Sequence, residues 1–234
     1  MVDSEYTGHV EPHGHSSVRR FPGLEIRKAS VGPMDNNAYL LTCRSTGSQL
    51  LIDAAAEPDR LLRLVAEGTR STGAEEAQLD LLVTTHSHHD HVGALTEVAV
   101  ATGARTAAGA ADIAAIEAPI DVPLTHGDVL EFGEQQVQII ALRGHTPGSV
   151  AVLWHDAAQA EGGGPHLFTG DSLFPGGVGN TDQDPARFAQ LLDDVEQRVF
   201  DVLPDSTWVY PGHGDDTTLG AQRASLPLWH ERGW

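Results

Sequence analysis

The sequence has a single cysteine, few basic residues and no long apolar run. Cys43 is the only cysteine among 234 residues, which excludes an intramolecular disulfide. Lys and Arg number 14 against 33 Asp and Glu, so the formal net charge is −19. A chain this acidic repels polyanions at long range, and we expect no nucleic-acid partner. No stretch reaches the ~20 apolar residues of a membrane helix, so we expect no membrane partner either.

The beginning of the chain is polar. Its first residues, MVDSEYTGHVEPHGHSS, lack the apolar core of a signal peptide, so we expect a cytoplasmic location. They include His9, His13 and His15, and we predict a flexible, histidine-containing tail over residues 1–20 whose removal leaves activity unchanged. Hydrophobic residues make up 40% of the chain, which is typical of a globular protein. Residues 21–234 are expected to form a single domain.

Strand and helix patterns alternate in two similar halves. The first half predicts strands at LEIRKASV, NAYLLT, SQLLIDA, LDLLVTT and ARTAA, and helices at residues 57–67, GALTEVAVATG and ADIAAIEA. The second half predicts strands at GDVLEFG, EQQVQIIAL, SVAVLWH, PHLFTG and STWVYPG, a helix at DPARFAQLLDDVEQRVFDVL, and an exposed hairpin or linker at AQAEGGGP. This order favours an α+β sandwich of two β-sheets packed face to face, with helices on the outside.

Ligand-type side chains are concentrated after the buried strand LDLLVTT. The loop HSHHDH supplies His86, His88, His89, Asp90 and His91 within six positions. Neutral imidazole and carboxylate groups are the ligands that borderline divalent metals prefer, and surface loops rarely gather so many of them after an apolar strand. The loop therefore predicts a metal site.

Three further candidates follow apolar runs elsewhere in the chain. His145 lies in RGHTPGS, Asp171 in FTGDSLF and His213 in YPGHGDD, each next to glycine. Glycine fits a strand end where the backbone turns sharply beside a site. Each residue alone is a weak signal, but with the loop they supply enough ligands for two ions.

Taken together, THSHHDH, GHTPGS, GD and PGHG resemble the metallo-β-lactamase superfamily from Leu24 onward. The resemblance implies an αββα sandwich and a binuclear site. It assigns His86, His88 and His145 to the first ion, Asp90, His91 and His213 to the second, and Asp171 to both. Asp53, which ends LLID, is implied to support the ligands from behind. His89 falls on the variable position of the motif, and the unmatched His126, His155, His166 and His230 are expected to be structural or solvent-facing.

The resemblance also implies the chemistry. Two divalent ions, zinc in the first place with iron or manganese as alternatives, would supply a bridging hydroxide beside the catalytic carboxylates Asp90 and Asp171. The segments GDSLFPGGVGNTD and YPGHGDDTTLGAQR are similar to the glyoxalase II, or hydroxyacylglutathione hydrolase, branch, and most of all to its short bacterial members, since only residues 214–234 follow His213. This implies hydrolysis of a small-molecule thioester, whose thiolate leaves without a general acid.

Two residues bear on the thiol carrier. Asn180 stands where that branch carries Lys or Arg, a cation that helps to bind the glutathione carboxylate. Arg223 matches an arginine after the last ligand that could bind such a carboxylate. We therefore expect Asn180 and Arg223 at the substrate site, with glutathione itself placed in doubt by the missing cation.

Other activities of this superfamily remain alternatives. A persulfide dioxygenase uses one iron on the equivalents of His86, His145 and Asp171, and it does not need the second ligand set. A lactonase or β-lactam hydrolase is also possible, although the commonest β-lactamases carry cysteine in place of Asp171. A nuclease would add basic surface, which this chain lacks. A non-catalytic metal-binding member would usually have lost part of the ligand set.

Overall fold

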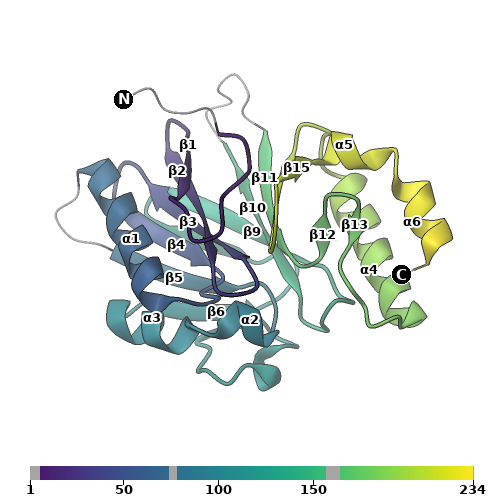
Figure 1. The fold of residues 1–234 in the computed structure, drawn as a ribbon, viewed down its shortest axis with the longest axis horizontal. Coiled ribbons are helices and arrows are strands. Elements are labelled where there is room, and N and C mark those ends of the chain that lie inside the picture. The colour runs from purple at the N-terminus through teal and green to yellow at the C-terminus, as the bar shows by residue number, and fades with distance from the viewer. Residues whose placement is uncertain (1–5, 74–77, 157–163, 234) are drawn as a thin grey trace.

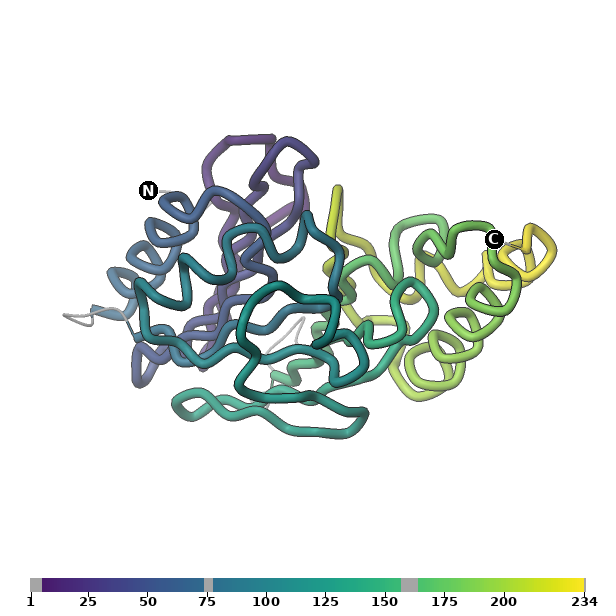
Figure 2. Tube along the Cα trace, turned by 90° about the horizontal axis from the view of Figure 1, so that it is seen from below, coloured from purple at the N-terminus to yellow at the C-terminus, as the bar shows by residue number. Residues whose placement is uncertain are grey.

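The computed structural model describes residues 6–73, 78–156 and 164–233. Figure 1 shows two sheets packed face to face, with α1, α2 and α3 on one outer side and α4, α5 and α6 on the other. The view from below separates the N-terminal part of the chain from the C-terminal helices in the same way (Figure 2). The predicted sandwich of two sheets with outer helices is confirmed.

The first sheet has seven strands in sequence order. They are β1 (Ser17–Arg20), β2 (Leu24–Val31), β3 (Asn36–Cys43), β4 (Ser48–Ile52), β5 (Gln78–Thr84), β6 (Arg105–Gly109) and β7 (Val122–Leu124). Pairing is antiparallel from β1 to β4 and parallel from β4 to β7. The parallel crossovers put α1 (Pro58–Thr72) and α3 (Leu95–Thr102) on the outer face of this sheet.

The second sheet has six strands in the order β15-β14-β11-β10-β9-β8. They are β8 (Val129–Phe132), β9 (Gln135–Ala141), β10 (Val150–His155), β11 (Pro165–Gly170), β14 (Trp208–Pro211) and β15 (Thr217–Thr218). Only β11 and β14 pair in parallel. A separate hairpin joins β12 (Leu173–Phe174) to β13 (Gly177–Val178).

The remaining helical segments follow the strands of each half. They are α2 (His89–Val92), η1 (Ile113–Ala115), α4 (Pro185–Val195), η2 (Glu196–Phe200), α5 (Leu219–Arg223) and α6 (Leu226–Arg232). The expected helix at ADIAAIEA is only the short 3-10 turn η1, because the Asp112 carboxylate bonds to other loops instead of capping a helix. The stretch expected to form an exposed hairpin, 158–165, lies mostly outside the described residues.

Three apolar layers hold the sandwich together. The central layer joins side chains of both sheets, such as Ile26, Tyr39 and Phe168. One outer layer packs the first sheet on α1 and α3, and the other packs the second sheet on α4, η2 and α6. Strands β2 and β3 are buried along their whole length, because alternate residues face the central layer and an outer layer.

The N-terminal residues differ from the expected flexible tail. Ser17–Arg20 form β1, which pairs with β2, and Tyr6 and Gly8 bond to Asp216 in the loop after β14. The polar composition of this segment predicts that it is solvated. In the structure, Tyr6 and Gly8 instead form hydrogen bonds with the buried residue Asp216. The single domain over residues 21–234 stays a prediction. None of the helices in the described part of the chain has the length and hydropathy that crossing a bilayer requires.

Candidate metal centre

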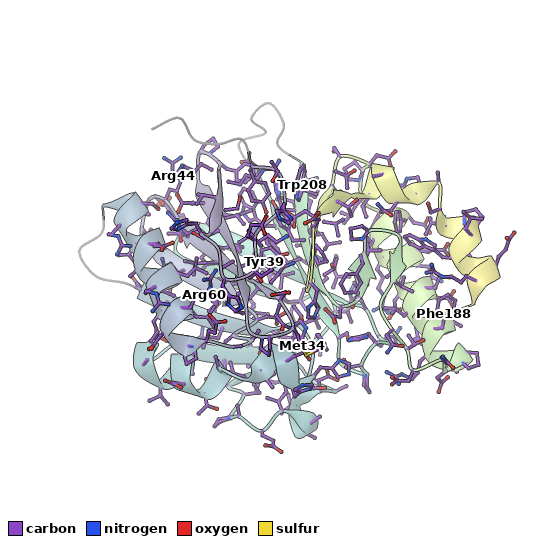
Figure 3. All side chains as sticks on the ribbon, viewed as in Figure 1. Met34, Tyr39, Arg44, Arg60, Phe188 and Trp208 are labelled. Carbon is purple, nitrogen blue, oxygen red and sulfur yellow. The ribbon has the colours of Figure 1, made fainter. Side chains whose placement is uncertain are left out.

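Four loops carry the expected ligands. His86 to His91 follow β5, His145 lies between β9 and β10, Asp171 follows β11 and His213 follows β14. Asn37 N donates to Gly212 O at 2.7 Å, which joins the start of β3 to the loop that carries His213. In Figure 3 Met34, in the neighbouring β2–β3 loop, lies well below Trp208.

The first group of ligands contains three histidines. His86 Nε2 lies 3.1 Å from His88 Nδ1 and 3.2 Å from His145 Nε2. His86 and His145 are buried, whereas His88 is partly exposed. These nitrogens therefore meet at one point beneath the surface.

The second group contains Asp90, His91 and His213. His213 Nε2 lies 3.3 Å from His91 Nε2 and 3.4 Å from Asp90 Oδ2, and His91 Nε2 lies 3.5 Å from the same oxygen. The three atoms form a second triangle beside the first group.

Asp171 lies between the two groups. Its Oδ1 is 3.4 Å from His91 Nε2, and its Oδ2 is 3.7 Å from His145 Nε2 and 3.6 Å from His213 Nε2. Oδ1 is buried without a hydrogen-bond partner among the described residues. A Cβ at Gly212 would collide with this oxygen, so glycine is needed where the last loop passes the carboxylate.

The separations within this cluster fit bound metal ions. Around a tetrahedral ion with bonds of about 2.0–2.1 Å, neighbouring ligand atoms lie roughly 3.3 Å apart. The nitrogen and oxygen atoms here are 3.1–3.7 Å apart, and several of these pairs join two acceptor atoms. A shared cation explains such contacts, and the clusters are consistent with a binuclear metal site.

The outer ring nitrogens are held by a surrounding set of acceptors. His91 Nδ1 donates to Asp53 Oδ2 at 2.9 Å, His145 Nδ1 to Asn180 O at 2.7 Å, and His213 Nδ1 to Met34 O at 2.9 Å. These bonds leave each Nε2 free as a ligand.

Asp53 lies directly behind His91. Its φ of 59° is left-handed, and its carboxylate also accepts Thr85 N at 2.7 Å and Thr85 Oγ1 at 2.8 Å. Aspartate is among the residues that tolerate this backbone region. Asp53 thus holds both the Thr85 backbone and the His91 ring, and its supporting role at a metal centre stays a prediction.

Burial and charge set the protonation states of the cluster. Burial, reinforced by the neighbouring histidines, holds the pKa of His86 well below its usual value, and burial also lowers the pKa of His145. Burial alone would lower the pKa of His91, but Asp53 and Asp171 outweigh it and raise that pKa to about 10. In the metal-free protein His91 therefore carries a proton that a metal must displace.

The other histidines lie away from the cluster or point out of it. His89 has an 89% exposed side chain, as expected for the variable position of the motif. His155 is exposed, His126 Nδ1 accepts Ala141 N, and His230 contacts Glu196. His166 is buried among aromatic rings.

The two expected substrate residues have different surroundings. Asn180 lies beside the cluster, because its carbonyl holds His145, and its exposed side chain accepts Asp182 N at 2.9 Å. Arg223 donates to Asp205 at 2.5 Å and to the carbonyls of Phe200 and Leu203. Its guanidinium is thus engaged in joining α5 to the end of η2.

Sequence reasoning missed three residues that organise these loops. Asn36 donates to Asp90 Oδ2 at 2.8 Å, and Arg187 donates to the carbonyls of Gly144 and His145. Asp112 accepts Ser87 N, Thr146 Oγ1 and Gly148 N, and so ties the HSHHDH loop to the His145 loop. None of the three gave a local signal of these contacts, because the partners named here lie far away in sequence.

Comparison with known proteins gives concordant matches. A model described as "Metallo-beta-lactamase superfamily" matches residues 31–213. The hydroxyacylglutathione hydrolase of Fuscovulum blasticum is 34% identical over 195 residues, which cover 83% of this chain and 68% of that protein. The chain spans 62–68% of the length of the first curated relatives with that name.

Two solved structures are also similar. ETHE1 from Myxococcus xanthus has a TM-score of 0.71 at 28% identity, with 88% of this chain and 84% of that chain covered. TTHA1623 in a di-iron-bound form has a TM-score of 0.64 at 31% identity, with 86% of this chain and 98% of that chain covered.

Proposed function

The chain belongs to the metallo-β-lactamase superfamily, and from this premise we propose that it is a two-metal hydrolase of small-molecule thioesters, similar to hydroxyacylglutathione hydrolases. In this proposal His86, His88 and His145 hold one ion, and Asp90, His91 and His213 hold the other. Asp171 binds both. The relatives with that name are longer than this chain, so their activity supports the proposal without fixing the thiol carrier.

The position of Asp171 carries the proposal. Its two carboxylate oxygens face histidines of both groups at 3.4–3.7 Å, and one oxygen is buried without another partner. A buried acceptor in this position is costly unless cations neutralise it. A mononuclear centre would leave Asp90 and His213 without a ligand role, although their facing atoms lie only 3.4 Å apart.

The residues of the chain prepare the site for hydrolysis. When bound, two divalent ions supply an activated water and polarise an acyl carbonyl. Asp53 and the carbonyls of Asn180 and Met34 fix the histidine tautomers, and Asn36 fixes the Asp90 carboxylate. A thiolate leaves without protonation, so a site whose acids and bases all serve as ligands is sufficient for a thioester.

The thiol carrier must be recognised without a cation at position 180. The Asn180 side chain is neutral, and the Arg187 guanidinium beside it is paired with Asp182 at 2.6 Å. The contacts of Arg223 with Asp205, Phe200 and Leu203 leave it little capacity to bind a carboxylate. We propose that a carrier less dependent on carboxylate recognition than glutathione is the better substrate.

A hydrolysis screen on protein of measured metal content tests this function. Thioesters, lactones and β-lactams are compared on protein purified without chelator, and metals are counted by elemental analysis. We expect close to two transition-metal ions per chain and turnover of thioesters above the other classes. One iron per chain with oxygen uptake on a persulfide would instead establish a dioxygenase, and β-lactam turnover alone would refute the thioesterase.

A further inference from the structure

A buried ion pair lies directly behind the loop that carries His213. Lys28, on β2, and Asp216, just before β15, both have side chains with 0% exposure. Lys28 Nζ donates three bonds of 2.7 Å each, to Gly8 O, Gly214 O and Asp216 Oδ1. All three ammonium protons therefore have an acceptor.

The second oxygen of Asp216 is also satisfied. Its Oδ2 accepts Tyr6 OH at 2.7 Å and Trp208 Nε1 at 2.8 Å, and the Asp216 backbone N donates to Gly8 O at 3.2 Å. The N-terminal segment thus supplies two of the groups that complete the pair. It is not a free tail at these positions.

The pair acts on the backbone next to His213. Gly214, whose carbonyl Lys28 holds, is the residue after His213, and Asn37 Nδ2 donates to the same carbonyl at 2.9 Å. On the other side of the ligand, Pro211 O accepts Asn37 Nδ2 at 2.9 Å and Tyr39 OH at 2.7 Å. Hydrogen bonds therefore fix the backbone on both sides of His213.

Such a pair needs an explanation beyond fold stability. Burying two charges is expensive, and well-packed apolar residues of similar size are often at least as stabilising. The pair nevertheless fixes one position of a loop, because each donor and acceptor has its partner in only that position. The same loop carries His213, whose imidazole must face Asp90 and His91 at 3.3–3.4 Å.

We propose that Lys28 and Asp216, completed by Tyr6 and Gly8, form a positioning lock that sets His213 for metal binding. This inference rests on the proposed role of His213 as a ligand. The lock residues touch neither metal nor substrate. Residues 6–9 are consequently part of the support of the metal centre, contrary to the expectation that the segment is dispensable.

Metal affinity of full-length variants tests the lock. Lys28→Met is compared with Arg27→Met, a buried arginine on the same strand that pairs with Glu25 at 2.7 Å and faces away from His213. Zn²⁺ binding is measured by competition with a chelator. We expect Lys28→Met to lower the affinity for one of the two ions roughly tenfold or more, which is the usual effect of losing a group that supports a ligand. The affinity for the other ion should not change. Arg27→Met should bind both ions as the wild type does.

Coupling to His213 separates positioning from general destabilisation. In a His213→Ala background, Lys28→Met should cause no further loss of affinity. An additive loss there, or wild-type affinities in a folded Lys28→Met protein, would overturn the proposal. If Lys28→Met does not fold, Tyr6→Phe decides, because it removes one bond to Asp216 and keeps both charges. A selective loss for one ion then supports the lock, and unchanged affinities refute it.

Failure of the proposed function gives a different result. If the wild type binds fewer than two ions, the two-metal assignment is wrong, and hydrogen exchange of residues 211–218 in metal-free protein then tests the lock alone. Faster exchange in Lys28→Met, or in Tyr6→Phe, than in Arg27→Met supports it. Equal exchange overturns it.

Discussion

Asp171 faces both ligand groups. Asp171→Ala removes a ligand from each proposed ion, so turnover should fall by about a hundredfold or more, with a lower metal content. His89→Ala is the matched change within the motif, because the His89 side chain is 89% exposed and points out of the cluster. Its turnover should stay near that of the wild type. Equal losses in the two variants, measured with the same thioester, would contradict the register assigned to HSHHDH.

Asn180 tests carrier recognition. A charge-assisted bond to a carboxylate contributes roughly 1.5–3 kcal/mol, or about tenfold or more in affinity. Asn180→Arg should therefore lower KM for S-lactoylglutathione and leave kcat nearly unchanged, because a remote contact is shared by ground state and transition state. Asn180→Met controls for the loss of the bond to Asp182 N. A low wild-type KM that neither variant changes would show that another group holds the carrier.

His166 gives the fold a pH dependence far from the metal centre. Burial, together with the charge of Arg19, lowers its pKa to about 3, so the folded state keeps it neutral. The unfolded state binds a proton below about pH 6.5, so this group's effect on stability is absent above that pH and grows as pH falls toward 3. Between pH 7 and pH 5 it should lower the free energy of unfolding by about 2 kcal/mol.

The variant His166→Asn removes this titration and keeps an acceptor for Tyr210 OH, which lies 2.9 Å from His166 Nδ1. Urea unfolding of metal-free protein should show a smaller loss of stability between pH 7 and pH 5 than in the wild type. The exposed His155→Asn on the adjacent strand should keep the wild-type difference. A wild-type pH dependence in His166→Asn would assign the acid sensitivity to other groups.

At the scale of elements, the length of each strand or helix decided whether the sequence could predict it. Strands β2 and β3 have eight residues each and show clear apolar patterns, and helix α3 ends at Gly103, where φ is 71°. Strands β12, β13 and β15 have two residues each, which is too short for an alternating pattern to appear. Their positions depend on long-range contacts that no local pattern records.

Helix α4 connects element stability to the metal centre. Asp184 caps it by accepting Ala186 N at 2.8 Å and Arg187 N at 3.1 Å, and Arg187 then holds the carbonyl of His145. Asp184→Ala should lower the free energy of unfolding by about 1 kcal/mol, measured by urea denaturation. Metal content should stay at the wild-type level, because the buried side chains of the helix, such as Phe188 and Leu191, do not depend on the cap for their packing. A lower metal content would show that the cap also fixes the His145 loop.

At the scale of the whole molecule, the seven expected ligands could be proposed from the sequence because four lie in one motif and three follow strands with flanking glycine. Their convergence required the fold, since the sequence does not state which strand ends share an edge. Lys28, Asn36 and Arg187 could not be found in this way. Each acts through backbone or side-chain partners far along the chain, and a lone polar residue in a strand or helix carries no local signature of such contacts.

Metal removal should destabilise the whole sandwich. An ion that binds only the folded state stabilises it. When the free ion concentration is about 100 times the Kd, the free energy of unfolding rises by roughly 2.7 kcal/mol per site. For a chain of this size, each kcal/mol corresponds to about 2–4 °C in Tm. Chelation should thus lower Tm by roughly 5–10 °C per site, and added Zn²⁺ should restore it in differential scanning calorimetry. A Tm that does not respond to chelator would indicate that the cluster folds without metal.

The outermost strands of the two large sheets are all short. β1 and β8 have four residues, β7 has three and includes Pro123, and β15 has two. Edge strands that are short, charged or contain proline offer few backbone groups for β-sheet pairing with another molecule. Strand β2, which β1 covers, is eight residues long and buried along its whole length. Loss of Ser17–Arg20 would turn this strand into an open border, and the chain would then offer a template for intermolecular β-sheet growth.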